Sequence, residues 1–272
     1  MSVDRGAQAT AVGAQYVARL LQVDAANPSL VDRIAIDVAL AIVDGRIAPG
    51  DKVDSVSVAR RYHSSRTPAR EAMLLLERHG LVTTVPRRRP RVTIVPAETM
   101  MQIYDVRAVL SALVSRLVCT NATDEDLEEL RLLLDAMGEA AASGSESAYF
   151  WANVAYNERS AEISRNPVLA QTLDSLGLRV LRLRRLTFSI EGQVERSLAS
   201  HRRIQDAFEA RDADLAAALT SSVIRSAKEA LAADYDRHAR KLAERGPSLL
   251  EDRDAELDDG ETETRSSEST PV

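Results

Sequence analysis

The sequence predicts a mainly α-helical protein with one small β-hairpin, and three observations lead to this fold class. Aromatic residues make up only 4% of the chain, while Ala, Leu, Val and Arg dominate, which favours helix over sheet. Apolar residues recur at helical spacing along most of the chain. Runs rich in Val and Thr occur only between residues 81 and 95, where they flank a short basic segment.

Residues 1–27 are predicted to form an N-terminal arm that is partly disordered. Residues 1–12 are small and polar and are expected to be disordered. Residues 13–26 are expected to form a short helix, with Val17, Leu20, Leu21 and Val23 on its apolar side.

Residues 28–96 alternate short helices and turns and end in the hairpin. Ser29 or Asp32 can cap a first helix that Gly45 ends, and a second short helix covers residues 55–62. A third helix begins after Ser65, with Pro68 tolerated in its first turn. Its core-facing residues are predicted to be Met73, Leu74 and Leu76. Helix, helix, turn, helix and hairpin is the element order of a winged helix-turn-helix.

Residues 97–242 are predicted to form an all-α helical bundle, because they contain no strand pattern. A first apolar stripe comprises Ile103, Val106, Leu110, Leu113 and Leu117, and Thr123 with Asp126 opens the next helix. Later helices are expected over 148–164, 168–187, 194–211 and 213–242. Residues 243–272 form an acidic, Ser/Thr-rich tail that is expected to be disordered.

The formal net charge of −6 hides an uneven distribution. Residues 246–272 hold nine acidic and two basic residues, whereas residues 46–96 hold eleven basic and four acidic residues. A local basic surface of this kind is typical of proteins that contact phosphate. The net charge of the whole chain therefore does not exclude nucleic acid as a partner.

The single cysteine, Cys119, lies among apolar residues and is expected to be a buried thiol. A reducing cytoplasm suits a chain with one unpaired cysteine. No apolar run approaches the roughly 20 residues that span a bilayer, so no membrane partner is expected.

Several short motifs carry a family resemblance. They are Ile47-Ala-Pro-Gly50, Val58-Ala59, Leu76-Glu77, Gly80-Leu81 and above all Ser65-Arg-Thr-Pro-Ala-Arg-Glu-Ala72. On these motifs, residues 30–96 resemble the DNA-binding domain of the GntR family of bacterial transcription regulators. The helical remainder resembles the FCD-type effector domain of the FadR-like subgroup, on the motifs Tyr104-Asp-Val-Arg107, Asn166-Pro167, Ser200-His-Arg-Arg-Ile-Gln-Asp-Ala207 and Arg211-Asp-Ala213.

The start of the third helix carries the predicted DNA contacts. Arg66 and Arg70 share a helix face, and arginine pairs bidentately with guanine in the major groove. The hydroxyls and free amides of the first turn can bind phosphate, and the arginines of the hairpin can touch the backbone or the minor groove. The predicted contacts are Arg60, Ser65, Arg66, Thr67, Arg70, Arg87, Arg88 and Arg89.

Plainer interpretations of these arginines stay open. Arg66 and Arg70 can form a solvated face with an Arg70–Glu77 pairing, and the hairpin arginines can be a solubilising loop. The chain also departs from the family, because Ser55-Val56 stands where Glu-Arg is common and Arg89-Pro90 replaces a usual Gly. We therefore expect an operator preference that differs from that of relatives.

Many FCD domains hold a metal through Asp-x-x-x-His on one helix and two later histidines. Here Asn153 and Asn157 stand at the first two positions, His201 matches the third, and no histidine lies near Ser222-Val223, where the fourth should fall. One imidazole and two amides suit Zn²⁺ poorly, so no metal cofactor is expected.

The resemblance instead implies a pocket for a small organic effector, with a carboxylate as the candidate chemistry. The predicted contacts are Arg107, Asn153, Asn157, Arg184 and His201, with Arg182 as a further candidate. The alternative is that these are ordinary bundle or surface residues.

The leading hypothesis is a homodimeric, ligand-responsive transcription regulator, expected to be a repressor of the bacterial cytoplasm and nucleoid. A two-fold dimer would present two recognition helices to a pseudo-palindromic operator in double-stranded DNA. The alternative is a constitutive dimeric DNA-binding protein whose helical domain serves only dimerisation. An enzyme is not expected, because the sequence contains no paired nucleophile and base and no Gly-rich phosphate loop.

Overall fold

The computed structural model describes residues 5–53, 55–84 and 89–244, with side chains described from residue 12 to 235 within those ranges. Chain contacts define a large unit, Met1–Ala232, and a C-terminal unit, Ala233–Val272. Every site discussed below belongs to the large unit. The acidic tail lies outside the described residues.

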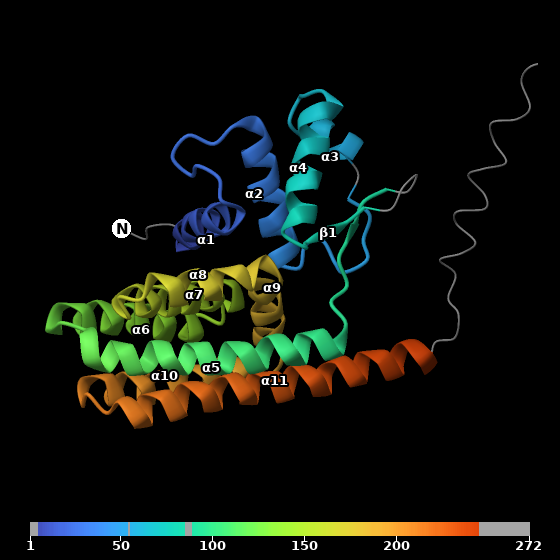
Figure 1. The fold of residues 1–272 in the computed structure, drawn as a ribbon. Coiled ribbons are helices and arrows are strands. Elements are labelled where there is room, and N and C mark those ends of the chain that lie inside the picture. Colours follow the sequence, from blue (N-terminus) through green and yellow to red (C-terminus); the bar gives the residue numbers. More distant parts are fainter. Residues whose placement is uncertain (1–4, 54, 85–88, 245–272) are drawn as a thin grey trace, which may run out of the picture. The chain divides into compact units, whose positions relative to one another are not determined.

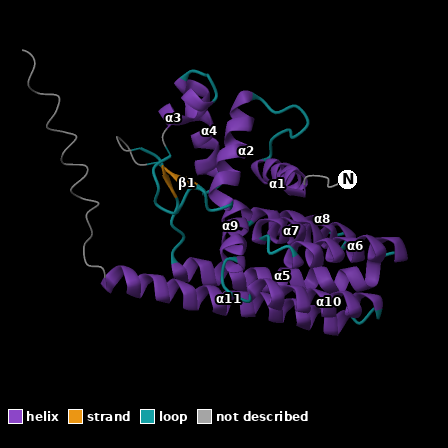
Figure 2. Ribbon diagram, turned by 180° about the vertical axis from the view of Figure 1, so that it is seen from behind, coloured by secondary structure: helices purple, strands orange, loops and turns teal. Residues whose placement is uncertain are grey.

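The N-terminal part of the large unit contains a helix-turn-helix with a two-stranded wing (Figures 1 and 2). Its elements are α1 Arg5–Leu21, α2 Leu30–Val43, α3 Ser55–Arg61, α4 Arg66–Arg78, β1 Val82–Thr83 and β2 Arg91–Val92. The strands are antiparallel, and Val82 pairs with Val92. This order confirms the predicted winged helix-turn-helix, although both strands are shorter than expected.

The first helix, α1, begins at Arg5, within the segment that was expected to be disordered. It is stabilised by partners that are distant in the sequence, because α1 packs against α2, α7 and α9. Val17 and Ala18 are fully buried in these contacts. Helices of this length depend on tertiary packing more than on local propensity. The sequence pattern therefore did not predict that α1 extends toward the N-terminus as far as Arg5.

The helix α2 begins with a capping box. The Ser29 hydroxyl accepts the Asp32 backbone N–H at 3.2 Å, and the Asp32 carboxylate accepts the Ser29 backbone N–H at 3.0 Å. Both candidate caps therefore act together, and two amides that lack intrahelical partners are satisfied.

The buried face of α4 consists of Ala69, Ala72, Met73 and Leu76. Leu74 is 52% exposed, so its predicted place in the core is wrong. A residue that directly follows a buried one on a helix is turned away from it by about 100°. Leu74 therefore leaves the core that Met73 enters.

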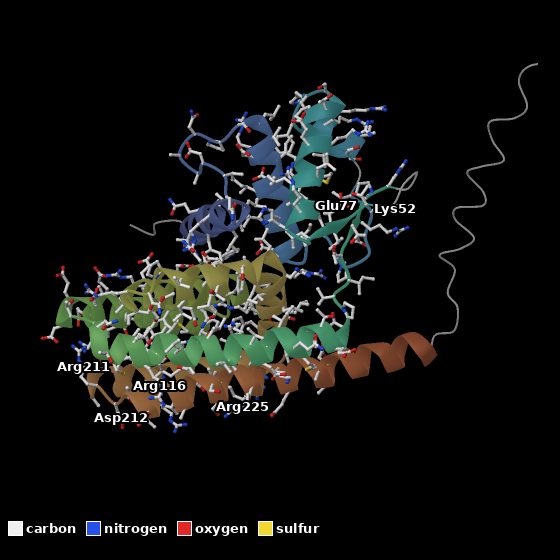
Figure 3. All side chains as sticks on the ribbon, in the orientation of Figure 1. Lys52, Glu77, Arg116, Arg211, Asp212 and Arg225 are labelled. Atoms are coloured by element: carbon white, nitrogen blue, oxygen red, sulfur yellow. The ribbon has the colours of Figure 1, made fainter. Side chains whose placement is uncertain are left out.

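The second part of the large unit is an all-helical bundle, as predicted. Its helices are α5 Ala97–Asn121, α6 Asp124–Ala142, α7 Glu146–Ile163, α8 Pro167–Ser175, α9 Gly177–Phe188, α10 Gln193–Glu209 and α11 Ala213–Glu244. The helix α6 packs on α7 and α10, and α5 packs on the same two helices. Arg211 joins the α10–α11 turn to the end of α5, because its guanidinium donates to the Ala122 carbonyl at 2.6 Å (Figure 3).

One predicted helix is divided in two. Residues 168–187 were expected to be continuous, but Gly177 has a left-handed φ of 68° and separates α8 from α9. Glycine adopts this conformation without the steric cost that a Cβ atom imposes. After the break, α9 runs across the direction of α8 (Figure 1).

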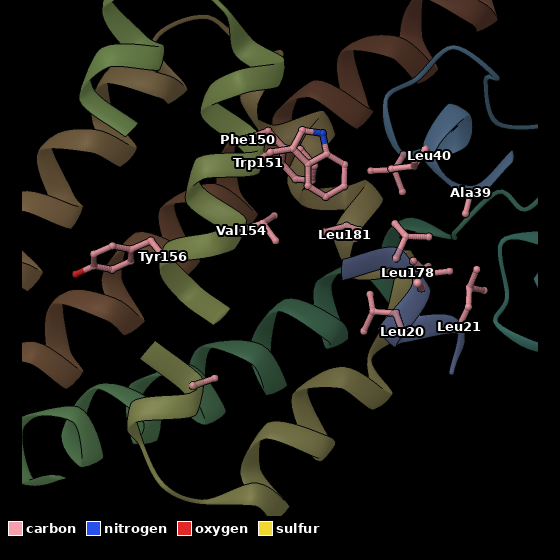
Figure 4. Packing of buried hydrophobic residues seen from close by; sticks show 14 of the residues in the cluster. Leu20, Leu21, Ala39, Leu40, Phe150, Trp151, Val154, Tyr156, Leu178 and Leu181 are labelled. Atoms are coloured by element: carbon pink, nitrogen blue, oxygen red, sulfur yellow. The ribbon is translucent and has the colours of Figure 1, made fainter. Parts of the chain in front are cut away.

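Residues from three separate segments share one hydrophobic core. Leu20 and Leu21 of α1 lie near Ala39 and Leu40 of α2 and near Leu178 of α9 (Figure 4). Cys119 is buried and unpaired, as predicted. None of the helices in the described ranges combines the length and the apolar character needed to cross a bilayer.

The helix α5 leaves part of its predicted apolar stripe uncovered. Val106 is 48% exposed and Leu113 is 41% exposed, and Val109 beside them is 70% exposed. Tyr104 and Val118 are instead among the fully buried residues of α5. The helix has apolar residues on more than one face, so its spacing alone did not identify the face that packs inward.

Candidate functional sites

The first candidate site is the exposed N-terminal end of α4. Arg66, Thr67 and Arg70 are exposed there, and Ser65 before them is exposed as well. Ser65 occupies the N-cap position with an extended backbone, but its side chain makes no capping hydrogen bond. The first-turn amides of α4 are thus available for an anion together with the hydroxyls and guanidiniums, which is an arrangement that favours phosphate.

The turn between α3 and α4 fixes how this end of α4 is presented. His63 has a left-handed φ of 47°, and the Ser64 backbone N–H donates to the Ala59 carbonyl at 3.0 Å. Arg60, in the last turn of α3, is exposed beside this turn. The structure therefore places Arg60 and the start of α4 in one region, as the helix-turn-helix prediction requires.

The wing is anchored at its base by backbone hydrogen bonds. The Gly50 N–H donates to the Val92 carbonyl at 2.9 Å, and the Val53 N–H donates to the Pro90 carbonyl at 2.8 Å. Arg89 is exposed directly before this anchored base. Arg87 and Arg88 lie outside the described residues, so their predicted contact with DNA stays a prediction.

Glu77 of α4 binds the wing and not Arg70, with which the sequence alone allowed it to pair. Its carboxylate accepts the backbone N–H of Thr84 at 2.9 Å and so ties the wing to α4. The ion pairs found among the described residues do not include one between Arg70 and Glu77. The guanidinium of Arg70 is therefore not held by this carboxylate.

The second candidate site is a cavity of about 150 Å³ in the helical bundle. All five residues predicted to contact an effector line it, although they come from four helices. They are Arg107 of α5, Asn153 and Asn157 of α7, Arg184 of α9 and His201 of α10. The further candidate, Arg182, is placed elsewhere and donates to the Thr93 carbonyl at 2.9 Å.

A chain of hydrogen bonds orders the polar side of the cavity. His201 Nδ1 donates to the Ser197 carbonyl at 2.8 Å, because a carbonyl can only accept. His201 Nε2 then accepts from Asn153 Nδ2 at 3.1 Å, and Asn153 Oδ1 accepts from Arg184 Nη2 at 2.8 Å. Each group therefore has a defined donor or acceptor role.

Burial keeps His201 neutral. Together with the nearby positive charges of Arg184 and Arg107, burial lowers the pKa of His201 to about 4, although the hydrogen bond to the Ser197 carbonyl opposes the shift. A neutral imidazole accepts through Nε2, so Asn153 can donate to it. His201 thus holds the amide that in turn orients Arg184.

Two arginines on the cavity wall lack a carboxylate partner among the described residues. Arg184 is 7% exposed, and the Arg107 guanidinium lies over the Tyr104 ring at 5.8 Å from its centroid. Burial lowers the pKa of Arg107 to about 10, and the nearby charge of Arg184 adds to that shift. Both guanidiniums remain charged at neutral pH, and neither forms an ion pair with another described residue.

The donor set of the cavity does not fit a metal ion. No group of three or more His, Cys, Asp or Glu side chains with metal-binding geometry occurs in the part of the chain that the structure describes. The Asn153 oxygen, at a position where related domains place a ligand, already accepts from the Arg184 guanidinium. A divalent cation at this point would be repelled by that fixed charge.

Other residues that line the cavity were not predicted as contacts. Tyr104, which opens one of the family motifs, lies 2.9 Å from Thr187 between their hydroxyl oxygens, and Tyr16 of α1 and Glu158 of α7 also line the cavity. Tyr16 lies far from every motif of the family resemblance. Only the packing of α1 against α7 reveals that it belongs to this wall.

Comparison with known proteins identifies two segments of the chain. Residues 30–92 match the bacterial regulatory proteins of the gntR family, and residues 102–226 match the FCD domain. The helix-turn-helix-type transcriptional regulator YdhC of Bacillus subtilis is 30% identical over 164 residues, which cover 60% of this chain and 73% of the relative.

Two further proteins extend this likeness. The probable D-xylose utilization operon transcriptional repressor of Paenarthrobacter nicotinovorans is 28% identical over 179 residues, 66% of this chain and 78% of that protein. The solved structure of E. coli McbR/YncC has the same fold, with a TM-score of 0.67 and 20% identity over 77% of this chain and 100% of that one.

The winged helix-turn-helix and the helical bundle thus define a bacterial transcription regulator. The chain belongs to the GntR family, in the group whose second domain is an FCD domain. Regulators of this family bind DNA operators, and the exposed start of α4 occupies the position of the recognition helix.

Proposed function

We propose that this chain is a transcriptional repressor that a small organic anion, with a carboxylate as its charged group, controls from the cavity without a metal. The observation that carries the proposal is a pair of arginines on the wall of one cavity, the half-buried Arg107 and the buried Arg184, which have no carboxylate partner among the described residues.

The energetics of burial favour an anionic ligand. A charged group taken out of water is costly unless it is paired, and a guanidinium matches a carboxylate through two parallel hydrogen bonds. Two guanidiniums whose charges repel each other gain most when an anion lies between them. The neutral amides of Asn153 and Asn157 supply further polar contacts without adding charge.

The DNA contacts proposed for the repressor are Arg60, Ser65, Arg66, Thr67, Arg70, Arg87, Arg88 and Arg89. A repressor releases its operator when the effector prefers a conformation that binds DNA less well. The D-xylose operon relative is named a probable repressor, which supports repression rather than activation by this chain.

The proposed repressor acts as a homodimer through α5. Val106, Val109 and Leu113 form an exposed apolar stripe along this helix, at spacings that place them on one face. Such a stripe is typical of a surface that a second copy covers, because a two-fold interface brings the same residues of both copies together.

The proposal is tested with the full-length chain and an operator selected from a random DNA pool. Operator affinity is measured by fluorescence anisotropy with acetate, succinate, citrate and inorganic phosphate as probes, after treatment with a chelator. We expect at least one carboxylate to weaken operator binding by about tenfold or more, within the usual range of allosteric coupling.

The Arg107→Gln and Arg184→Gln variants should lose this response, while Arg203→Gln, at an exposed arginine of α10, should keep it. An operator affinity that no probe alters would favour the alternative of a constitutive dimeric DNA-binding protein. A response that returns only when Zn²⁺ is added would contradict metal-free binding.

A further inference from the structure

The helix α1 lies outside both segments that match the family, which begin at residues 30 and 102. It nevertheless packs against α7 of the bundle on one side and against α2 of the helix-turn-helix on the other. Tyr16 of α1 lines the same cavity as the two unpaired arginines. An element outside the matched segments therefore completes the wall of the cavity.

The hydroxyl of Tyr16 is a hydrogen-bond donor without a protein partner among residues 12–53, 55–84 and 89–235. Burial and the nearby negative charge of Glu158 raise the pKa of Tyr16 to about 12. The phenol is therefore protonated at neutral pH and keeps its O–H for a ligand. A half-buried donor on a cavity wall gains most from a charged acceptor.

Ion pairs hold this part of α1 on the cavity wall. The Arg19 guanidinium pairs with Glu158 of α7 and lies 3.2 Å from Asp174 of α8. It also lies over the Tyr16 ring, 4.9 Å from the centroid. Arg19 offsets one of the two negative charges of these carboxylates, so that together with Arg107 and Arg184 three guanidiniums face two carboxylates and the local charge is still positive.

Close packing fixes α1 further toward its N-terminal end. A Cβ atom placed on Gly13 would lie 2.8 Å from the ring of Trp151, so only glycine allows this approach. Trp151 is the only tryptophan of the chain. Its fluorescence therefore reports whether α1 is docked on α7.

We infer that α1 forms one wall of the effector site and that the Tyr16 hydroxyl donates a hydrogen bond to the bound anion. This inference rests on the proposed function. Because α1 also packs on α2, this hydrogen bond would connect the bound anion, through α1 alone, to the first helix of the DNA-binding domain.

The inference is tested by isothermal titration of the full-length chain with acetate, succinate and citrate. Tyr16→Phe removes one oxygen atom. It should lower the affinity for the probe that binds most tightly by about tenfold or more, which is the loss expected for a hydrogen bond to a charged group. Tyr62→Phe is the matched control, because the Tyr62 hydroxyl donates to Asp37 away from the cavity.

A second variant tests the wall itself. Gly13→Leu should push α1 away from Trp151 and shift the tryptophan emission to longer wavelength. It should also lower the affinity for the same probe. In Tyr16→Phe the emission should stay unchanged, which shows that α1 remains docked.

The outcomes separate the two proposals. If the wild-type chain binds a probe and Tyr16→Phe binds it equally well, or Gly13→Leu changes the emission without changing affinity, the inference about α1 is overturned while the proposed function stands. If none of the probes binds the wild-type chain, the proposed function fails, and the inference fails with it.

Discussion

Arginine side chains define two regions of this molecule, in opposite environments. At the start of α4, Arg66 and Arg70 extend into solvent beside free helix amides. In the cavity, Arg107 and Arg184 lie on the wall of a space of about 150 Å³ between helices. In the proposed function, the same chemical group meets a large polyanion at one site and a small anion at the other.

The difference teaches how the environment selects the anion. Exposed guanidiniums are screened by water and salt and cost little when they are unpaired, so they can scan DNA and leave it. Buried guanidiniums repel each other and lose hydration, so they favour a ligand that fits and neutralises them. Three changes test this contrast, in order of decreasing expected effect.

The largest effect is expected from Val109→Glu on the exposed stripe of α5. In the proposed dimer, this glutamate would be buried against the same glutamate of the second chain, which should prevent dimerisation. The two DNA-binding domains would then no longer bind the operator together. Operator affinity should fall on the order of 100-fold or more, because linked sites gain that much from effective concentration. Affinity for a carboxylate probe should not change, since each chain has its own cavity.

Sedimentation velocity should show the loss of the dimer, with anisotropy and calorimetry giving the two affinities. Leu132→Glu is the control, because Leu132 of α6 is 61% exposed and lies outside the stripe. A Val109→Glu protein that stays dimeric would contradict the α5 interface.

A smaller loss is expected when the arginines of α4 are removed. Arg66→Ala and Arg70→Ala should each weaken specific operator binding by about 1–3 kcal/mol, through the loss of base contacts in the major groove. Anisotropy titration against the selected operator measures the effect, and Arg203→Ala serves as the matched surface control. Unchanged operator affinity in both variants would show that these residues do not contact the operator.

The third prediction concerns folding stability, which should depend on pH through the buried imidazole. Because the pKa of His201 is lowered to about 4 in the folded chain, the unfolded chain binds a proton first as the pH falls. Folding stability should therefore decrease between about pH 6.5 and pH 4, by about 2 kcal/mol at pH 5 from this group.

Urea denaturation at neutral pH and near pH 5 measures this loss. The His201→Asn variant should lose less stability over the same interval. The pKa of His79 is also lowered by burial, but His79 is present in both proteins and cancels in the comparison. Equal losses in both proteins would show that His201 is not buried as a neutral base.

The two regions differed in how far the sequence could predict them. The DNA-binding surface lies in one run, Ser65 to Ala72, where helix periodicity alone places Arg66 and Arg70 on one face. The five predicted cavity residues come from four helices, and only the family resemblance indicated that they belong to one site. Tyr16 was missed because neither local periodicity nor a motif connects α1 with α7.

The errors of the sequence interpretation have physical causes. Leu74, Val106 and Leu113 are apolar residues that the described part of the chain leaves between 41% and 52% exposed, and spacing does not reveal which face of a helix packs inward. The break at Gly177 was missed because glycine is tolerated inside helices as well as at their ends. Its left-handed φ lets the two helices pack differently: α8 contacts α5 and α7, whereas α9 contacts α7 and also α1, α2 and α10.

That break also decides what α9 connects. Arg182 donates to the Thr93 carbonyl, just after the wing, while Arg184, two positions later, lines the cavity. A helix rises only about 1.5 Å per residue, so these two positions lie about 3 Å apart along its axis. One short helix therefore spans from the residue that follows the wing to the wall of the cavity, because a single glycine gives it a direction that differs from that of α8.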